Sequence, residues 1–370
     1  MVSKGIISAD SHVSEPGDLW IERIDREYQF RAPRLEQRVR DGKVQDFFIY
    51  EGWPPHSVGV GLGAAAQRGE SFREEGKGYA DALPGGWDPE ARLQDQDTDG
   101  VVAEVLYTTL GFRLYWMRDP GLMSACFRAY NDWLSDFCSE APDRLYGLAL
   151  ISLGDIPAAC QELRRARSLG HKGAMIPLSP AQGSFPYASH AYDEFWATAQ
   201  ELDIALVLHE NTGGAESQLS QSSYWNPESS IQRIVKPHEV QRSIAQLVIS
   251  GVFERFPALR VVSAENGTDW LPWFINRMGQ IKQKTNYETP LTMLPIEYFR
   301  RNVFFTYIDE PWAVENLEII GEDNLMFSTD YPHTASTWPK SQEVVERDCA
   351  DLPEGTRDKL VHDNVLAVFR

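Results

Sequence analysis

Short apolar segments recur along the chain and alternate with segments of helical periodicity. Eight of them are rich in β-branched or aliphatic residues, namely residues 5–10, 101–108, 145–151, 173–178, 204–209, 259–265, 303–308 and 324–330. Near-continuous apolar runs are typical of strands that are buried on both faces of a parallel sheet. Residues 156–169 and 191–202 instead space Leu, Ala, Glu and Arg as an amphipathic helix does. The alternation predicts an α/β fold of the (β/α)8 TIM-barrel type, with an open doubly wound sheet as the alternative.

Two long stretches interrupt this pattern. Residues 13–98 follow the first predicted strand and are rich in Gly, Pro, Arg and aromatic residues, whereas residues 212–238 follow the fifth strand and are polar. Loops of this length usually line or cover a binding site, and both would leave the C-terminal face of the barrel, where barrel enzymes have their sites. We therefore expect one barrel domain over residues 1–370 with these two insertions.

The charge balance limits the class of partner. The chain has 370 residues, with 35 Lys and Arg against 54 Asp and Glu, and its formal net charge is −19. Nucleic acids and anionic membranes bind clustered basic residues, so neither is expected as a partner. The sequence contains no apolar stretch of ~18 residues and no signal-peptide pattern, and its cysteines form no CxxC pair. We expect a cytoplasmic protein that acts on a small molecule.

Carboxylates and imidazoles stand where several of the predicted strands end. Asp10 and His12 lie two residues apart, so their side chains share one face of an extended strand. His209, Glu265 and Asp330 end three further strands. A single such residue is more often structural, but the coincidence at four strand ends predicts a shared site. Its mixed nitrogen and oxygen donors suit a divalent metal such as Zn²⁺ or Mn²⁺.

Four segments also resemble a known family. They read ADSHVSEP (residues 9–16), VLHEN (207–211), AENGTDWLPW (264–273) and MFSTDYPHTASTWP (326–339). In these segments the chain resembles the amidohydrolase-related family, which includes the aminocarboxymuconate-semialdehyde and resorcylate decarboxylases, from about residue 5 to residue 368. The resemblance implies a (β/α)8 barrel with one divalent metal at its C-terminal face. It places the metal ligands at Asp10, His12, His209 and Asp330, with Zn²⁺ as the first choice of ion and Mn²⁺ as the second.

The chain departs from the decarboxylases of that family at two positions. Asp10 stands where their first motif often has Glu or His, and Glu265 stands where they usually have an acid/base histidine. A carboxylate beside a metal can also accept or deliver a proton, so a catalytic site survives the change. Glu265 is therefore expected to act as acid/base, and the alternatives are a metal ligand or a structural partner of an arginine.

Residues around this set are expected to bind the substrate or support the ligands. Arg113 could hold a substrate carboxylate with two hydrogen bonds, although an ordinary salt bridge is the alternative. Trp116, Tyr224 and Trp225 could stack on a flat ring, or could form the hydrophobic cores of their own loops. We expect Glu15, in the segment SEP, and His333, three residues after Asp330, to support the ligands from outside the metal site.

Two reactions fit these residues, with Asp330, Glu265 and His209 as the expected catalytic groups. The first is non-oxidative decarboxylation of a small carboxylated aromatic or cyclic metabolite, in which Asp330 protonates the ring carbon. The alternative is hydrolysis of a lactone, ester or amide by a metal-activated water. A third possibility is a barrel that has lost catalysis and acts as a scaffold. The sequence contains no GxSxG segment, so a serine hydrolase is not expected. A homodimer is an expectation from the resemblance alone.

Overall fold

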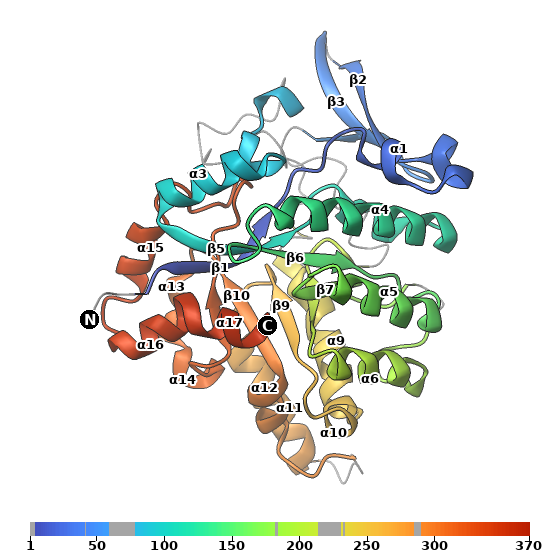
Figure 1. Cartoon of the computed structure of the whole chain (residues 1–370). Helices are drawn as coiled ribbons and strands as arrows, with labels where there is room; N and C mark the ends of the chain where they lie inside the picture. The colour runs from blue at the N-terminus through green and yellow to red at the C-terminus, as the bar shows by residue number, and fades with distance from the viewer. Residues whose placement is uncertain are drawn as a thin grey trace.

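The computed structural model describes residues 4–40, 42–58, 78–181, 184–213, 231, 234–284 and 290–370. Its centre is an eight-stranded sheet in the order β1-β5-β6-β7-β8-β9-β10-β11 (Figure 1). The strands are β1 Ile6–His12, β5 Val101–Tyr107, β6 Leu145–Leu150, β7 Gly173–Ile176, β8 Ala205–His209, β9 Val261–Ala264, β10 Val303–Tyr307 and β11 Leu325–Phe327. All neighbouring strands in this order pair in parallel. The predicted (β/α)8 barrel is confirmed.

The apolar runs of the sequence become the strands because both faces of the sheet are covered. Every residue of β1, β7, β8 and β9 is buried. Helices on the outside cover one face, and the barrel interior fills the other. The polar residues at the ends of these runs therefore lie at the C-terminal rim, where the buried apolar pattern stops.

The helices of the barrel follow the predicted alternation. The main ones are α3 Pro89–Asp99, α4 Pro120–Ser139, α5 Ile156–Ser168, α6 Asp193–Glu201, α9 Pro237–Ile249, α11 Leu271–Lys284, α12 Pro295–Asn302 and α15 Ser341–Asp348. Shorter ones are α10 Val252–Arg255, α13 Pro311–Glu315, α14 Leu317–Ile320, α16 Glu354–Asp358 and α17 Asn364–Val368. The helices predicted over residues 156–169 and 191–202 are α5 and α6. Within the described ranges, no helix is long and apolar enough to cross a membrane.

Helix α5 shows how the sequence sets these boundaries. The Asp155 side chain accepts a hydrogen bond from the backbone N–H of Ala158 and so caps the first turn. The buried face of the helix carries Ala159, Cys160, Leu163 and Ala166 at helical spacing. The chain leaves the helix at Gly170, whose φ of 96° is favourable for glycine alone.

The stretch after β1 forms a small layer above the barrel. It contains α1 Leu19–Arg23 and an antiparallel sheet of β2 Arg34–Arg40, β3 Lys43–Ile49 and β4 His56–Ser57. The β2–β3 hairpin projects away from the barrel strands (Figure 1). The last part of the predicted insertion, residues 89–98, belongs to α3, which leads into β5. Most of the second predicted insertion, with Tyr224 and Trp225, lies outside the described residues.

The first and last strands of the barrel meet without a regular ladder. In the described chain, β1 forms ladder bonds with β5, and β11 forms them with β10. Two backbone hydrogen bonds join the strand ends instead, from His12 N–H to the Tyr331 carbonyl (2.6 Å) and from Asp330 N–H to the Asp10 carbonyl (2.9 Å). The Ser8 hydroxyl also accepts the Thr329 N–H (2.9 Å). This seam between β1 and β11 fixes Asp10 and His12 beside Asp330.

Candidate active site

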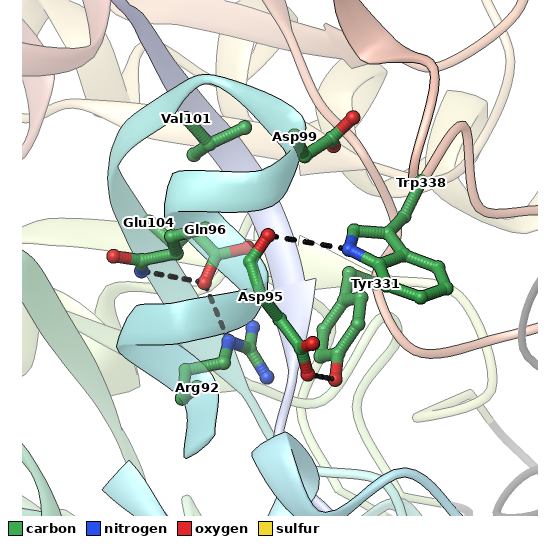
Figure 2. A pocket seen from close by; sticks show the side chains of 8 residues that line it. All are labelled: Arg92, Asp95, Gln96, Asp99, Val101, Glu104, Tyr331 and Trp338. Atoms are coloured by element: carbon green, nitrogen blue, oxygen red, sulfur yellow. Dashed lines mark hydrogen bonds and ion pairs between the residues drawn. The ribbon is translucent and has the colours of Figure 1, made fainter. Parts of the chain in front are cut away.

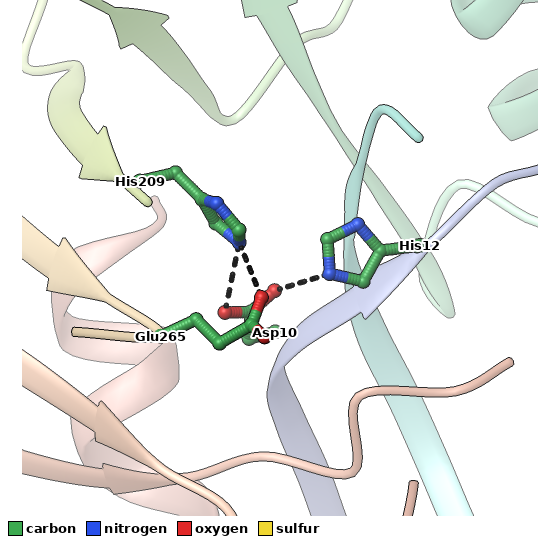
Figure 3. A group of neighbouring side chains, drawn as sticks. All are labelled: Asp10, His12, His209 and Glu265. Carbon is green, nitrogen blue, oxygen red and sulfur yellow. Dashed lines mark ion pairs between the residues drawn. The ribbon is translucent and has the colours of Figure 1, made fainter. Parts of the chain in front are cut away.

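The polar strand ends converge in one buried cluster at the C-terminal rim. Asp10 and His12 come from β1, His209 is the last residue of β8, and Glu265 follows β9 (Figure 3). His12 Nε2 lies 3.3 Å from Asp10 Oδ1 and 3.2 Å from Asp330 Oδ1. His209 Nε2 lies 3.5 Å from Asp10 Oδ2 and 3.3 Å from Glu265 Oε2. The structure therefore brings together all five residues that the sequence placed at strand ends.

The hydrogen bonds on the far side of each imidazole fix its tautomer. His12 Nδ1 lies 2.9 Å from the Thr108 carbonyl, and His209 Nδ1 lies 2.8 Å from the Glu210 carbonyl. A carbonyl oxygen can only accept, so Nδ1 carries the hydrogen in both rings. In a neutral ring the lone pair is then on Nε2, which faces carboxylates in both cases. A lone pair that faces a carboxylate is repelled unless a proton or a metal ion lies between them.

The buried polar atoms of the cluster fit a cation. In the described part of the chain, no hydrogen bond reaches His12 Nε2, His209 Nε2 or either carboxylate oxygen of Asp10 and Asp330. These four side chains are at most 1% exposed. Buried charges without hydrogen bonds are costly unless they pair or coordinate a metal. One ligand atom each from Asp10, His12, His209 and Glu265 lie within 4.8 Å of one another, which is a suitable spacing for one metal ion.

The cluster shifts the pKa values of its own members. Burial alone would raise the pKa of Asp330, but His333 and His12 outweigh this and lower it. Burial would likewise lower the pKa of His12, but Asp10 and Asp330 hold that pKa well above its ordinary value. Glu265 behaves in the opposite way to Asp330, because burial and the charge of Asp330 raise its pKa. The two carboxyl groups, Asp330 and Glu265, therefore differ in proton affinity.

The backbone is strained at two of these residues. Glu265 has a φ of 53° and Asp330 has a φ of 52°. Both values lie in the left-handed region of the backbone, which residues other than glycine rarely adopt. Nearby hydrogen bonds maintain this conformation, from Glu265 N–H to the Thr306 hydroxyl (3.1 Å) and from Asp330 N–H to the Asp10 carbonyl. Strain of this kind costs about 1–3 kcal/mol and concentrates at functional sites. It turns both carboxylates toward the cluster.

His333 supports the cluster from one side. Its ring stacks on that of His12, with 3.9 Å between centroids. Its Nδ1 lies 3.0 Å from Asp330 Oδ1, and its Nε2 lies 3.0 Å from the Thr109 hydroxyl. His333 is thus in contact with two of the expected ligands, His12 and Asp330, as the sequence suggested.

Glu15 organises the loop that supports His12. Its fully buried carboxylate accepts the Thr108 hydroxyl and the backbone N–H groups of Leu110 (2.8 Å) and Gly111 (3.0 Å). These bonds hold the Thr108 carbonyl in the position where it accepts from His12 Nδ1. Glu15 therefore acts on the imidazole through the loop and does not touch the metal-binding atoms.

The expected substrate residues Arg113 and Trp116 lie in the loop after β5. The Arg113 guanidinium lies 5.0 Å from the Trp116 ring centroid, and its Nη2 is 2.8 Å from His56 Nε2. The Trp116 indole N–H donates to the Gly213 carbonyl (3.1 Å) and the ring is buried. The neighbouring Phe112 stacks on His209 at 4.6 Å, so this loop reaches the cluster through Phe112.

Sequence reasoning missed two charged residues near the cluster. Lys236, the N-cap of α9, forms an ion pair with Glu210, the residue after His209. Burial lowers the pKa of Lys236 to about 8, against the charges of Glu265 and Asp330, which raise it. Burial also raises the pKa of Glu310 to about 7, although the Thr268 hydroxyl donates to this carboxyl. Lys236 stands in a polar stretch without periodicity, whereas Glu310 follows β10 and could have been found as another strand-end acid.

A parallel barrel with a buried cluster of carboxylates and imidazoles at its C-terminal rim is typical of barrel enzymes, and the cluster is a candidate site for a divalent metal. Residues 53–370 match the amidohydrolase family, and the chain belongs to this family. It is 28% identical over 265 residues to the gamma-resorcylate decarboxylase of Rhodococcus jostii (strain RHA1), covering 66% of this chain and 76% of that protein. It is 25% identical over 301 residues to the 2-amino-3-carboxymuconate-6-semialdehyde decarboxylase of Dictyostelium discoideum, covering 79% of each.

Solved structures show the same fold. An amidohydrolase from Mycobacterium avium subsp. paratuberculosis K-10 superposes with a TM-score of 0.80 at 19% identity, covering 100% of each chain. A dihydroxybenzoic acid decarboxylase from Polaromonas sp. JS666, which contains bound manganese, has a TM-score of 0.65 at 19% identity, covering 99% of this chain and 97% of that one.

These comparisons decide between the reactions expected from the sequence. The chain is an enzyme of the amidohydrolase superfamily, so the scaffold without catalysis is not supported. The relatives bear out the expectation of a carboxy-lyase and do not favour the hydrolytic alternative. The cluster is a candidate site for one divalent metal ion, and nothing in it singles out zinc.

Glu310 provides a test of the electrostatics at this rim. Its pKa of about 7 lies above the ordinary value of 4.5, so the folded chain binds this proton more tightly than the unfolded chain. Stability should therefore fall as the pH rises from about 4.5 to about 7, and should stay lowered above that pH. Glu310→Gln removes this loss, so the variant should gain up to about 3 kcal/mol over the wild type between about pH 4 and about pH 8.

Urea unfolding of both proteins at the two pH values measures this difference. Glu318→Gln is the matched control, because Glu318 is exposed on α14 and its replacement should leave the pH dependence unchanged. If the Glu310→Gln variant and the wild type differ equally at both pH values, Glu310 does not bind a proton on folding.

Proposed function

We propose that this enzyme removes CO₂ from a small aromatic carboxylate that carries a neighbouring hydroxyl group, without oxidation. The observation that carries the proposal is the buried cluster of carboxylates and imidazoles whose inward atoms lack hydrogen bonds in the described chain. The names of the relatives, which include two decarboxylases of small carboxylates, support the reaction class. The small size of this buried cluster, whose grouped ligand atoms lie within 4.8 Å of one another, supports a small-molecule substrate.

We propose Asp10, His12, His209 and Asp330 as the residues that hold one divalent metal ion. Two carboxylates and two imidazoles give equal numbers of oxygen and nitrogen donors, and carboxylates suit Mn²⁺ while imidazoles also suit Zn²⁺. Mn²⁺ is the preferred choice here because the structural neighbour named above contains manganese. A bound divalent ion would supply positive charge for the substrate carboxylate and its neighbouring oxygen.

Glu265 is the better proton donor of the two carboxyl groups that the sequence offered for this role, Asp330 and Glu265. The sequence pointed to Asp330, but its lowered pKa keeps it ionised, whereas burial and the charge of Asp330 raise the pKa of Glu265. Carboxyl pairs with separated pKa values divide into an acid and an ion in many enzymes. In the proposed reaction the bond from the ring to the carboxylate breaks, CO₂ leaves, and the electron pair on the ring carbon takes the proton from Glu265. A proton from solvent then restores Glu265.

Lys236 is the proposed cation for the substrate. The chain carries a net charge of −19, so an anionic substrate needs a local positive group. Lys236 lies at the rim next to Glu210, and its pKa of about 8 leaves it mainly charged at neutral pH. Arg113, with Trp116 and Phe112, offers a second place for a flat anionic ring, where Phe112 stacks on His209. The cytoplasmic location, the homodimer and the single-domain organisation stay predictions from the sequence.

The proposed reaction predicts CO₂ release that depends on the metal. The purified chain, stripped with a chelator and reloaded with Mn²⁺ or Zn²⁺, should release CO₂ from 2,6-dihydroxybenzoate or a related hydroxybenzoate, and should leave lactones, esters and amides intact. Asp330→Asn should abolish this release, because it removes an expected ligand, and inductively coupled plasma analysis should show less bound metal. Hydrolysis of an ester or lactone without CO₂ release would overturn the proposal.

Glu265→Gln separates proton transfer from metal binding. Because the amide cannot donate the catalytic proton, the rate should fall roughly 10²–10⁴-fold while the metal content stays near that of the wild type. The exposed Glu318→Gln on α14 is the control and should keep full activity. A Glu265→Gln protein that has lost its metal would instead identify Glu265 as a ligand.

Lys236→Met should weaken substrate binding more than turnover. A hydrogen bond to a charged group is worth ~1.5–3 kcal/mol, so KM should rise roughly 10–100-fold while kcat changes little. Lys236→Arg should keep most of the affinity, and Lys340→Met, at an exposed lysine, should keep all of it. The double variant Lys236→Met with Glu210→Gln avoids leaving Glu210 unpaired. An unchanged KM in that double variant would show that Lys236 does not bind the substrate.

A further inference from the structure

A buried ion pair lies behind the strand that supplies Asp10 and His12. Arg92 on α3 and Glu104 on β5 are 0% and 3% exposed, and Arg92 Nε donates to Glu104 Oε2 at 2.5 Å (Figure 2). Neither residue belongs to the metal cluster. A buried pair of this kind is weak evidence for stabilisation, because the loss of hydration offsets much of the attraction. The contacts of the pair with β1 and Tyr331 indicate that it positions the backbone of this strand.

The Arg92 guanidinium contacts both sides of the seam between β1 and β11. Its Nη1 donates to the His12 carbonyl (2.7 Å). Its Cζ lies 4.4 Å from the ring centroid of Tyr331, the residue after Asp330. The His12 N–H in turn donates to the Tyr331 carbonyl. One side chain on α3 therefore fixes the backbone of one expected ligand and the neighbour of another.

Glu104 holds the same strand through its second oxygen. Its Oε1 accepts the Ser11 hydroxyl (3.0 Å), and its Oε2 also accepts the Gln96 amide (2.7 Å). Ser11 lies between Asp10 and His12, so on an extended strand its side chain points away from theirs. The Ser11 hydroxyl also lies 2.9 Å from that of Thr329, next to Asp330. Glu104 and Thr329 therefore hold β1 from one face, and the expected ligands Asp10 and His12 extend from the other face.

We infer that Arg92 and Glu104 are positioning residues that set the affinity of the metal site. They hold Asp10 and His12 in register with Asp330 at the seam, where the described strands have no ladder of their own. Residues that orient metal ligands without touching the metal typically change metal affinity 10–100-fold when replaced. The inference rests on the proposed metal-dependent function, and it assigns these two residues a role that stability alone does not require.

The test uses conservative variants that weaken the contacts of Arg92, Glu104 and Ser11 with β1. Arg92→Lys keeps the charge but lacks the guanidinium fork that reaches both Glu104 and the His12 carbonyl. Glu104→Gln keeps the shape, and Ser11→Ala removes the hydroxyl that contacts Ser8, Glu104 and Thr329 while leaving both charges of the ion pair in place. Metal-free protein is titrated with Mn²⁺ in competition with a chelator, and Tm is measured with and without Mn²⁺. All three variants should bind Mn²⁺ more weakly, with Kd raised about 10–100-fold for Arg92→Lys, and saturating Mn²⁺ should restore kcat.

Arg260→Lys is the matched control. Arg260 is 11% exposed, pairs with Asp203, and donates to the carbonyls of Asp203 and Val368, but it stands before β9, at the strand end opposite the cluster. This variant should lower Tm and leave the Kd for Mn²⁺ unchanged.

The outcomes separate the two proposals. A wild type that binds Mn²⁺, with variants at Arg92, Glu104 and Ser11 that lose Tm but keep the wild-type Kd, overturns the positioning role and leaves the proposed function intact. A wild type that binds neither Mn²⁺ nor Zn²⁺ overturns the metal site itself and the positioning role with it. If Arg92→Lys and Glu104→Gln fail to fold, Ser11→Ala still decides, because an unchanged Kd in that variant contradicts the inference.

Discussion

Negative charge without a compensating hydrogen bond is the constraint that organises the C-terminal end of this barrel. Asp10 and Asp330 are buried, and both tautomer-fixed imidazoles turn their Nε2 atoms toward carboxylates. The penalty for burying one unpaired carboxylate is several kcal/mol, a large part of the stability of an ordinary domain. A positive charge in the middle, whether a proton on His12 or a divalent ion, removes this penalty. A cation in this cluster should therefore stabilise the folded chain.

Much of the surrounding structure works to keep that arrangement from relaxing. Glu15 fixes the Thr108 carbonyl and so the tautomer of His12, while His333 stacks against the same ring. Left-handed backbone at Glu265 and Asp330 aims both carboxylates inward. Left to themselves, flexible carboxylates would turn toward solvent. Rigid neighbours keep them in place, and this pre-organisation is what lets a site bind a metal tightly and distinguish two carboxyl groups by their pKa values.

The sequence predicted the barrel and the cluster for a physical reason. Buried parallel strands are apolar along their whole length, so the polar residue that ends each run marks the rim, and topology alone brings those rims together. The same logic could not find Arg92. Helix α3 reads PEARLQDQDTD, a polar pattern typical of an exposed helix, yet Arg92, Gln96 and Asp99 are buried. Lys236 was missed because it lies in a polar stretch without helix or strand periodicity. The sequence pattern therefore gave no sign of its contact with Glu210 at the end of β8.

The seam between β1 and β11 has a consequence for how the enzyme is made. Ser8 and Thr329, whose hydroxyls meet there, are 321 residues apart in the chain. A ribosome releases the N-terminal strand long before the last strand exists, so β1 waits with its ligands unpaired while the intervening helices and strands form. No shortened product that ends before Asp330 can assemble the cluster. The event that closes the barrel therefore also brings Asp330 beside Asp10 and His12.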